Sequence, residues 1–360
     1  MAASVQASPR ASSDRRVLVP VHLDGPPALP PASAPMFRAH GLSMGTSWSV
    51  QGLLDDDGGG DVEDRLAAGV QSVLDRVVAE MSNWREDSDI GRFNRAGPGS
   101  WHVLPAACFA VLEAALTIAG DSGGAYDPTA GPLVDLWGFG PSGPRTAPPA
   151  LADIDAARAR CGWRRVEVDS DGRRVCQPGG LSLDLCAIAK GYAVDAVSAW
   201  LRAQGVVHHL VEVGGELRGE GVKPDGMPWW VELESPPAIS ARAGQRPEQR
   251  PEYQLTVVAL HGLSVATSGD YRRYFDSDGQ RYAHTIDPRT GYPTQHALAS
   301  VTVLHRQCML ADAWSTALTV LGPDAGARLA ERHGIAARML VRTPDGFAEV
   351  VTPAFAAMLA

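Results

Sequence analysis

Hydrophobic residues recur along this chain with a helical period in five segments. In the first of them Leu66, Val70, Leu74 and Val77 repeat at intervals of three and four, which places them on one face of a helix. The second begins with Pro105 and ends at a glycine, as helices often do. The pattern predicts helices at residues 61–81, 105–120, 187–205, 308–322 and 324–334.

Short runs rich in β-branched and aromatic residues separate these helices and are typical of strands. They cover residues 46–51, 164–169, 206–213, 228–234, 253–260, 281–287, 299–305 and 337–343. Several are joined by hairpin-type connections, so strict β-α-β alternation is disfavoured. We predict a single layered α+β domain with mixed sheets and packed helices.

Two stretches have little apolar surface to offset the entropy of ordering. Residues 1–36 are rich in Ala, Ser and Pro, and we predict a flexible tail there, followed by the domain at 37–360. Residues 235–252 have a similar composition and lie between two strand-like runs. We predict that they form a surface loop inserted into the domain.

Composition restricts the class of partner. The 360 residues are 45% hydrophobic and carry a formal net charge of −9 without a basic block, which argues against binding to nucleic acid. Five cysteines without a C-x-x-C pair do not predict a disulfide framework or a zinc site. Neither a transmembrane segment nor the apolar core of a signal peptide is found, so a cytoplasmic location is expected.

Two glycine motifs are set aside because their surroundings are wrong. GFGPSG at 138–143 matches the dinucleotide fingerprint, but a proline-rich run follows it instead of a helix. GLSMG at 41–45 matches the nucleophile elbow around Ser43, but a strand-like segment follows it. Neither motif predicts a site.

Polar groups inside apolar segments are more informative. Asp312, Ser315 and Thr316 stand at i, i+3 and i+4 of a predicted helix, so their oxygens share one face. Hydroxyl bonds to the preceding turn and a favourable helix dipole would explain them without any ligand. Lys190 lies inside the helix at 187–205, where its ammonium is costly to bury unpaired, so an anion or a carboxylate is predicted to meet it.

Eight segments follow one another along the chain: MGTSWSV (44–50), MSNWREDSDIGRFN (81–94), AYDPTAGPLVDLWGFG (125–140), LDLCAIAKGYAVD (183–195), VEVGGELRGEG (211–221), ATSGDYRRYF (266–275), HTIDPRTGYP (284–293) and ADAWSTALTVLG (311–322). In this order they resemble the motifs of the ApbE-like FAD:protein FMN transferases. The resemblance implies a T-fold-like α+β domain with FAD between two lobes. It also implies an enzyme that uses Mg²⁺ to split FAD, attaches FMN to a Thr hydroxyl of an acceptor protein and releases AMP.

The same resemblance implies roles for individual residues. Mg²⁺ is expected on Asp312, Ser315, Thr316 and the backbone carbonyl of Ala187, an oxygen set that suits this ion. FAD contacts are expected at Met44, Trp84, Ala125, Tyr126, Asp127, Asp184, Lys190 and Ile286. Core packing is the alternative for Met44, Trp84 and Ile286.

His284 and Asp312 are the expected catalytic residues. A neutral His284 imidazole could accept the proton of the attacking Thr, an imidazolium could steady a phosphate, and a structural histidine is the plain alternative. Two departures from the family pattern are Glu216, where Asp is commoner, and Cys186, where glycine is commoner.

Two other functions use the same residues. Water in place of the Thr would make a Mg²⁺-dependent FAD pyrophosphatase that yields FMN and AMP, and loss of catalysis would leave an FAD-binding maturation protein. Many members of the family are exported or attached to the cell surface, so that location is the alternative to the cytoplasm.

Overall fold

A central antiparallel sheet organises the computed structural model, which describes residues 15–21, 28–54, 59–236 and 255–360. Its strands, from one edge to the other, are β18 (Gly346–Val351), β17 (Ala336–Thr343), β16 (Leu298–His305), β11 (Leu263–Gly269), β8 (Glu216–Glu220), β7 (His209–Val213), β3 (Thr46–Leu53) and β2 (Met36–Ser43). Every neighbouring pair is antiparallel. Sequence neighbours pair at both edges, as hairpin connections require.

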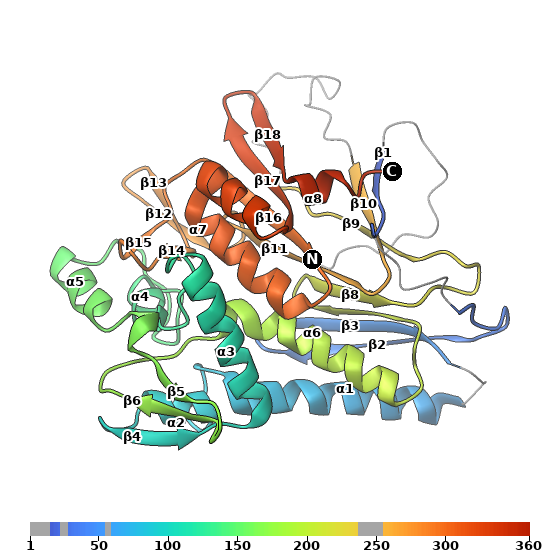
Figure 1. The fold of residues 1–360 in the computed structure, drawn as a ribbon, viewed down its shortest axis with the longest axis horizontal. Coiled ribbons are helices and arrows are strands. Elements are labelled where there is room, and N and C mark those ends of the chain that lie inside the picture. Colours follow the sequence, from blue (N-terminus) through green and yellow to red (C-terminus); the bar gives the residue numbers. More distant parts are fainter. Residues whose placement is uncertain (1–14, 22–27, 55–58, 237–254) are drawn as a thin grey trace.

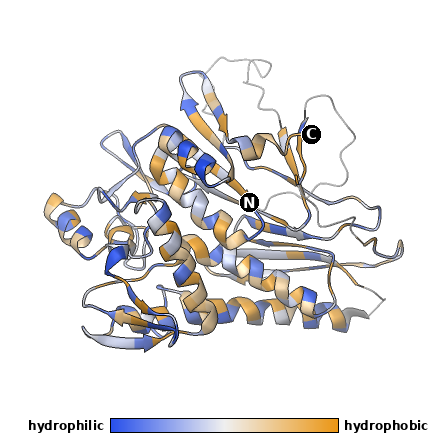
Figure 2. Ribbon diagram, viewed as in Figure 1, coloured by the Kyte–Doolittle hydropathy of each residue, from blue (hydrophilic) through white to orange (hydrophobic). Residues whose placement is uncertain are grey.

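Three helices pack on one face of this sheet: α1 (Gly59–Met81), α6 (Cys186–Ala203) and α7 (Cys308–Arg332) (Figure 1). A fourth helix, α3 (Ala106–Asp121), packs against these three. Their apolar stripes face inward, and Leu74, Val111 and Ala193 are fully buried together with Val211 of the sheet. Figure 2 shows apolar and polar residues alternating along these helices, which is the pattern of a helix with one buried face.

The other face of the sheet has its own smaller core. Here β1 (Arg15–Leu18), β10 (Leu255–Leu260) and β9 (Trp229–Glu232) form a mixed three-stranded sheet, in which β1 is parallel to β10. The short helix α8 (Pro353–Ala356) adds Phe355 to this core. Hydrophobic residues from both sheets therefore bury this face as well.

The predicted flexible tail is wrong for residues 15–18. They form β1, and the side chain of Leu18 is completely buried in the second core. Strand pairing and burial of the apolar run that contains Leu18 offset the entropy lost on ordering. The average composition of residues 1–36 did not reveal this short run. The predicted loop at 235–252 lies almost entirely outside the described residues.

Smaller elements flank one end of the helical layer. They are α2 (Asp89–Asn94), α4 (Gly131–Leu136), α5 (Leu151–Ala159), the 3₁₀ helix η1 (Trp163–Arg165), β4 (Ser100–Val103), β5 (Glu167–Asp169), β6 (Arg174–Gln177), β12 (Tyr274–Ser277), β13 (Gln280–Ala283), β14 (Ile286–Asp287) and β15 (Tyr292–Pro293). A third apolar cluster, with Trp137 and Ile154 fully buried, joins α4 and α5 to the β12–β15 hairpins.

The predicted α+β class is confirmed, with the eight-stranded sheet antiparallel and the sheet of β1, β10 and β9 mixed. The predicted helices at 308–322 and 324–334 meet at Gly322, whose φ of 77° breaks the helical path within α7. The predicted strand at 281–287 is interrupted at His284 and Thr285, between β13 and β14. No helix in the described ranges is both long and apolar enough to span a bilayer.

Candidate active site

One cavity of about 400 Å³ lies where the ends of several elements converge. Its wall is formed by the β2–β3 and β7–β8 turns, the start of α6, the end of β11, the segment before β14 and the first turns of α7. Twelve of the thirteen predicted site residues line it: Met44, Trp84, Ala125, Tyr126, Asp127, Asp184, Ala187, Lys190, His284, Ile286, Asp312 and Thr316.

A close crossing of α6 and α7 builds the floor of the cavity. At Gly191 a Cβ atom would lie 2.3 Å from the carbonyl oxygen of Cys308, so only glycine permits this approach. The Gly191 N–H donates to Asp312 Oδ2 at 3.0 Å. In a regular helix this N–H would donate to the carbonyl of Ala187, and Ala187 itself has non-helical angles. The crossing therefore fixes Asp312 beside Ala187, and both residues line the cavity wall.

The predicted metal ligands separate into two groups. Ala187, Asp312 and Thr316 line the cavity. Ser315 does not, because its hydroxyl is buried and bonds the Asp312 carbonyl at 2.8 Å and Ser268 Oγ at 2.7 Å. The role of Ser315 as a direct ligand stays a prediction, and in this structure its hydroxyl is bonded within the protein. Ser268 of β11 also lies 3.2 Å from the Thr316 hydroxyl, so one strand residue contacts both hydroxyls.

Lys190 meets a carboxylate, as predicted. Its Nζ forms an ion pair with Glu216 Oε1, while Glu216 is almost fully buried at the start of β8. Burial alone would lower the pKa of Lys190, but the charges of Glu216 and Asp312 outweigh it and raise that pKa. The pKa of Asp312 is also raised, in this case by burial, and the Lys190 ammonium partly offsets that rise. Burial also raises the pKa of Glu216, to about 7, so a cation near the two carboxylates would favour their charged forms.

His284 has the tautomer of a proton acceptor. Its Nδ1 lies 3.2 Å from the carbonyl oxygen of Arg273, which can only accept, so Nδ1 carries the proton and Nε2 is free to accept one. Burial, reinforced by the Arg273 charge, lowers the pKa of His284 to about 4. Of the roles predicted for His284, the geometry favours that of a neutral base over that of an imidazolium.

The predicted flavin contacts differ in how they are held. Trp84 is 51% exposed at the cavity, which excludes the alternative that it is a core residue. Ile286 is buried in the third apolar cluster and reaches the cavity with one side. The Tyr126 hydroxyl is buried without a hydrogen-bond partner in the described structure, as is Glu216 Oε2. Buried polar atoms of this kind call for a ligand or water at the cavity.

Asp127 and Asp184 also organise the loops on which they lie. Asp127 accepts bonds from the Thr129 N–H at 2.8 Å and from the Trp163 N–H at 3.1 Å. Asp184 accepts from the Cys186 N–H at 2.9 Å and so caps the start of α6. Part of the acceptor capacity predicted for FAD is therefore used by the protein itself.

Two residues outside the predicted set are central to the site. Gly191 allows the helix crossing, and Glu216 is the partner of Lys190. The glycine next to Lys190 and the acidic residue after Gly214 and Gly215 were visible in the sequence. Their pairing depends on how β8 lies against α6, which local pattern does not determine.

Comparisons with known proteins show the family of this chain. The model of the ApbE family matches residues 44–339. An FAD:protein FMN transferase of Vibrio cholerae is 36% identical over 322 residues, with 89% of this chain and 92% of that protein covered. This chain belongs to the ApbE family. A second ApbE relative, the FAD:protein FMN transferase of Escherichia coli K12, is 33% identical and covers 89% of this chain and 88% of its own length.

Solved ApbE structures share the fold. The apo form of the Pseudomonas stutzeri flavinyl transferase ApbE superimposes with a TM-score of 0.80 at 41% identity, covering 90% of this chain and 97% of that one. The flavin transferase ApbE of Vibrio cholerae gives a TM-score of 0.79 at 34% identity, with coverages of 91% and 100%.

Proposed function

We propose that this protein transfers FMN from FAD to a Thr hydroxyl of an acceptor protein, with the help of Mg²⁺, and releases AMP. Membership of the ApbE family and the names of its curated relatives support the class of reaction. The observation that carries the finer proposal is the joining of three parts in one cavity: an oxygen face on α6 and α7, the neutral base His284, and the exposed ring of Trp84.

The residues present suit a hard divalent cation. Asp312 offers a carboxylate, Thr316 a hydroxyl and Ala187 a carbonyl, while substrate phosphate and water would complete an octahedral set. No cluster of three or more His, Cys, Asp or Glu side chains able to hold a metal occurs in the part of the chain that the structure describes. A site with one carboxylate therefore fits Mg²⁺ better than a zinc-type ion. When bound, Mg²⁺ would neutralise charge on the phosphate oxygens.

The protein's own groups would handle the proton and the substrate. The Thr oxygen attacks the phosphorus on the FMN side of the pyrophosphate, and its proton passes to His284 Nε2. The bond from that phosphorus to the bridging oxygen breaks, and AMP leaves with this oxygen. Lys190, held by Glu216, stays charged beside the cavity and stabilises negative phosphate oxygens.

Transfer and hydrolysis are separated by one experiment. The purified chain is incubated with FAD, Mg²⁺ and each candidate acceptor, and both AMP and the intact mass of the acceptor are measured. Transfer predicts that the acceptor gains the mass of FMN less one water, in step with AMP release. AMP and free FMN without an acceptor adduct would indicate the pyrophosphatase, and no AMP at all would indicate a binding protein.

Two variants sharpen this test. His284→Ala should lose transfer while it still binds FAD, because the base is removed and the rest of the wall remains. An acceptor whose candidate Thr is replaced by Val should gain no mass. Labelling of the acceptor at the wild-type level, either by His284→Ala or at the Thr→Val acceptor, would contradict the proposed chemistry.

A further inference from the structure

A reciprocal set of bonds joins α6 and α7 one helical turn away from the cavity. The carboxylate of Asp195 on α6 accepts the Cys308 N–H at 3.0 Å and the Met309 N–H at 2.9 Å, the first amides of α7. In the other direction, the Gly191 N–H of α6 donates to Asp312 on α7. Each helix thus bonds backbone amides of its partner to a carboxylate, and the two contacts are one turn apart on both helices.

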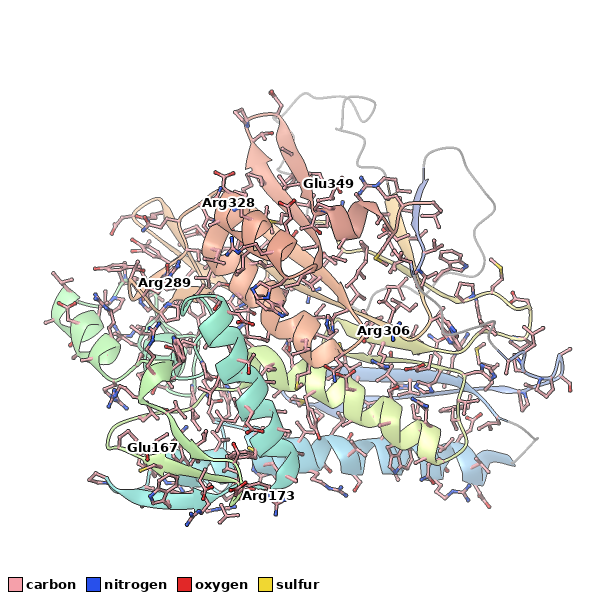
Figure 3. All side chains as sticks on the ribbon, in the orientation of Figure 1. Glu167, Arg173, Arg289, Arg306, Arg328 and Glu349 are labelled. Carbon is pink, nitrogen blue, oxygen red and sulfur yellow. The ribbon has the colours of Figure 1, made fainter. Side chains whose placement is uncertain are left out.

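Arg218 on β8 fixes this arrangement to the sheet. Its guanidinium lies 3.1 Å from Asp195 Oδ1 and also bonds the carbonyl of Arg306, just ahead of α7. Figure 3 labels Arg306 beside the first turn of α7. The same strand begins with Glu216, the partner of Lys190. Arg218 and Asp195, which do not line the cavity, thus join β8, α6 and the start of α7 through polar bonds.

We propose that Asp195, supported by Arg218, is a positioning residue for the oxygen face of the cavity. It sets the register of α7 on α6, so that the Ala187 carbonyl of one helix and Asp312 and Thr316 of the other face the same point. Asp195 does not line the cavity, so it acts through these helices and not on substrate. Capping also satisfies amide donors that the start of α7 would otherwise leave open.

The variant Asp195→Asn tests this directly. The amide keeps one acceptor oxygen but turns a donor toward an N–H, so α7 should lose one anchoring bond. Because supporting partners tune metal affinity strongly, the Mg²⁺ concentration for half-maximal FAD cleavage should rise by about tenfold or more. At saturating Mg²⁺ the kcat and the KM for FAD should stay close to the wild-type values. General loss of structure would change these constants together with the Mg²⁺ requirement.

Glu349→Gln is the matched control. Glu349 on β18, labelled in Figure 3, also pairs with arginines and is similarly half-buried, with 27% of its side chain exposed against 21% for Asp195. It does not line the cavity, so its loss should leave the Mg²⁺ requirement unchanged. Arg218→Gln should shift the Mg²⁺ requirement in the same direction as Asp195→Asn. An unchanged requirement in both network variants would overturn the proposal.

Hydrogen exchange without metal or FAD gives a readout that does not rest on the proposed function. Amides at 308–312 should exchange faster in Asp195→Asn than in wild type and in Glu349→Gln. Equal exchange in all three proteins would overturn the proposal, whatever the activity. Failure of the wild-type chain to cleave FAD at any Mg²⁺ concentration would instead contradict the proposed function.

Discussion

Met44 holds a backbone conformation that residues with side chains rarely adopt. It and Gly45 form the two-residue turn between β2 and β3, with φ values of 52° and 73°. Turns of this type favour Asn-Gly, and a left-handed non-glycine residue costs about 1 kcal/mol. The side chain of Met44 lines the cavity. Strain at a residue that faces a cavity motivates the prediction that the side chain is kept for contact with a ligand.

Met44→Asn should therefore separate stability from binding. We expect the free energy of unfolding in urea to rise by up to about 1 kcal/mol, while FAD binding, followed by flavin fluorescence, weakens several-fold. Asp278→Asn is the control, because Asp278 and Gly279 form the equivalent turn between β12 and β13, outside the cavity lining. FAD affinity unchanged in Met44→Asn would contradict a binding role for Met44.

His284 predicts an unusual pH profile. Because its pKa is lowered to about 4, the imidazole stays neutral through the range where an ordinary histidine gains a proton. Values of kcat/KM for transfer should show no ascending limb near pH 6.5 that is due to this group. A limb near pH 6.5 that vanishes in His284→Gln would show that His284 titrates normally, against this assignment.

The sequence predicted an anionic partner for Lys190 and candidate roles for His284, but it did not identify that partner or the tautomer of His284. Burial of Lys190 within a helix required an anion, which does not identify Glu216. The tautomer of His284 depends on the carbonyl of Arg273, eleven residues earlier, and hence on the pairing of β12 with β13. Such details follow from distances that local pattern does not contain.

At the scale of elements, the approach of α6 to α7 decides which residues face the cavity. Helical periodicity predicted both helices and placed Ser315 and Thr316 on one side. It could not show that Ser268 of β11 bonds the hydroxyls of both Ser315 and Thr316, or that only Thr316 lines the cavity. The crossing point at Gly191 likewise needs both helices in place.

Gly191→Ala should damage the site through this crossing. The added Cβ would overlap the Cys308 carbonyl and push the helices apart, which should cost about 1–3 kcal/mol of unfolding free energy and abolish most FAD cleavage. Gly120→Ala in α3 is the control, since its nearest neighbour would be Trp163 at 3.6 Å. This control should be neutral or slightly stabilising. Wild-type cleavage by Gly191→Ala would refute the role of the crossing.

For the whole molecule, buried histidines make stability depend on pH. His209 is fully buried; its Nδ1–H donates to the Val206 carbonyl and its Nε2 accepts from Ser198. Burial lowers its pKa to about 4, so between this value and about 6.5 the unfolded chain binds more protons. Stability from this residue is therefore full above about pH 6.5 and is lost as the pH falls toward 4.

This loss should be measurable by urea unfolding at pH 7.5 and pH 5. His209 should cost the wild-type protein about 2 kcal/mol between the two values, a difference that His209→Asn should lack. Carboxylates with raised pKa values, such as Asp195, act in the opposite sense in both proteins, so they cancel in the comparison. Equal pH slopes for both proteins would contradict a neutral buried His209.

The sequence also predicted much of the whole molecule: the α+β class, the principal helices and the distribution of site motifs from Met44 to Thr316. The class and the helices are confirmed because apolar periodicity is a strong signal, and the family is confirmed because the motifs occur in order. The strand at 15–18 was missed because its partner, β10, lies 240 residues later. Long-range pairing of this kind is not visible in local composition.

The central claim is that FAD lies in this cavity with its pyrophosphate against the oxygen face of α6 and α7. A crystal structure of the protein with FAD and Mg²⁺ tests it most directly. We expect the ion between the Ala187 carbonyl, Asp312 and Thr316, with the pyrophosphate beside it and within reach of His284. A flavin bound elsewhere, or an ion held by other residues while Asp312 packs away from the phosphates, would contradict the account.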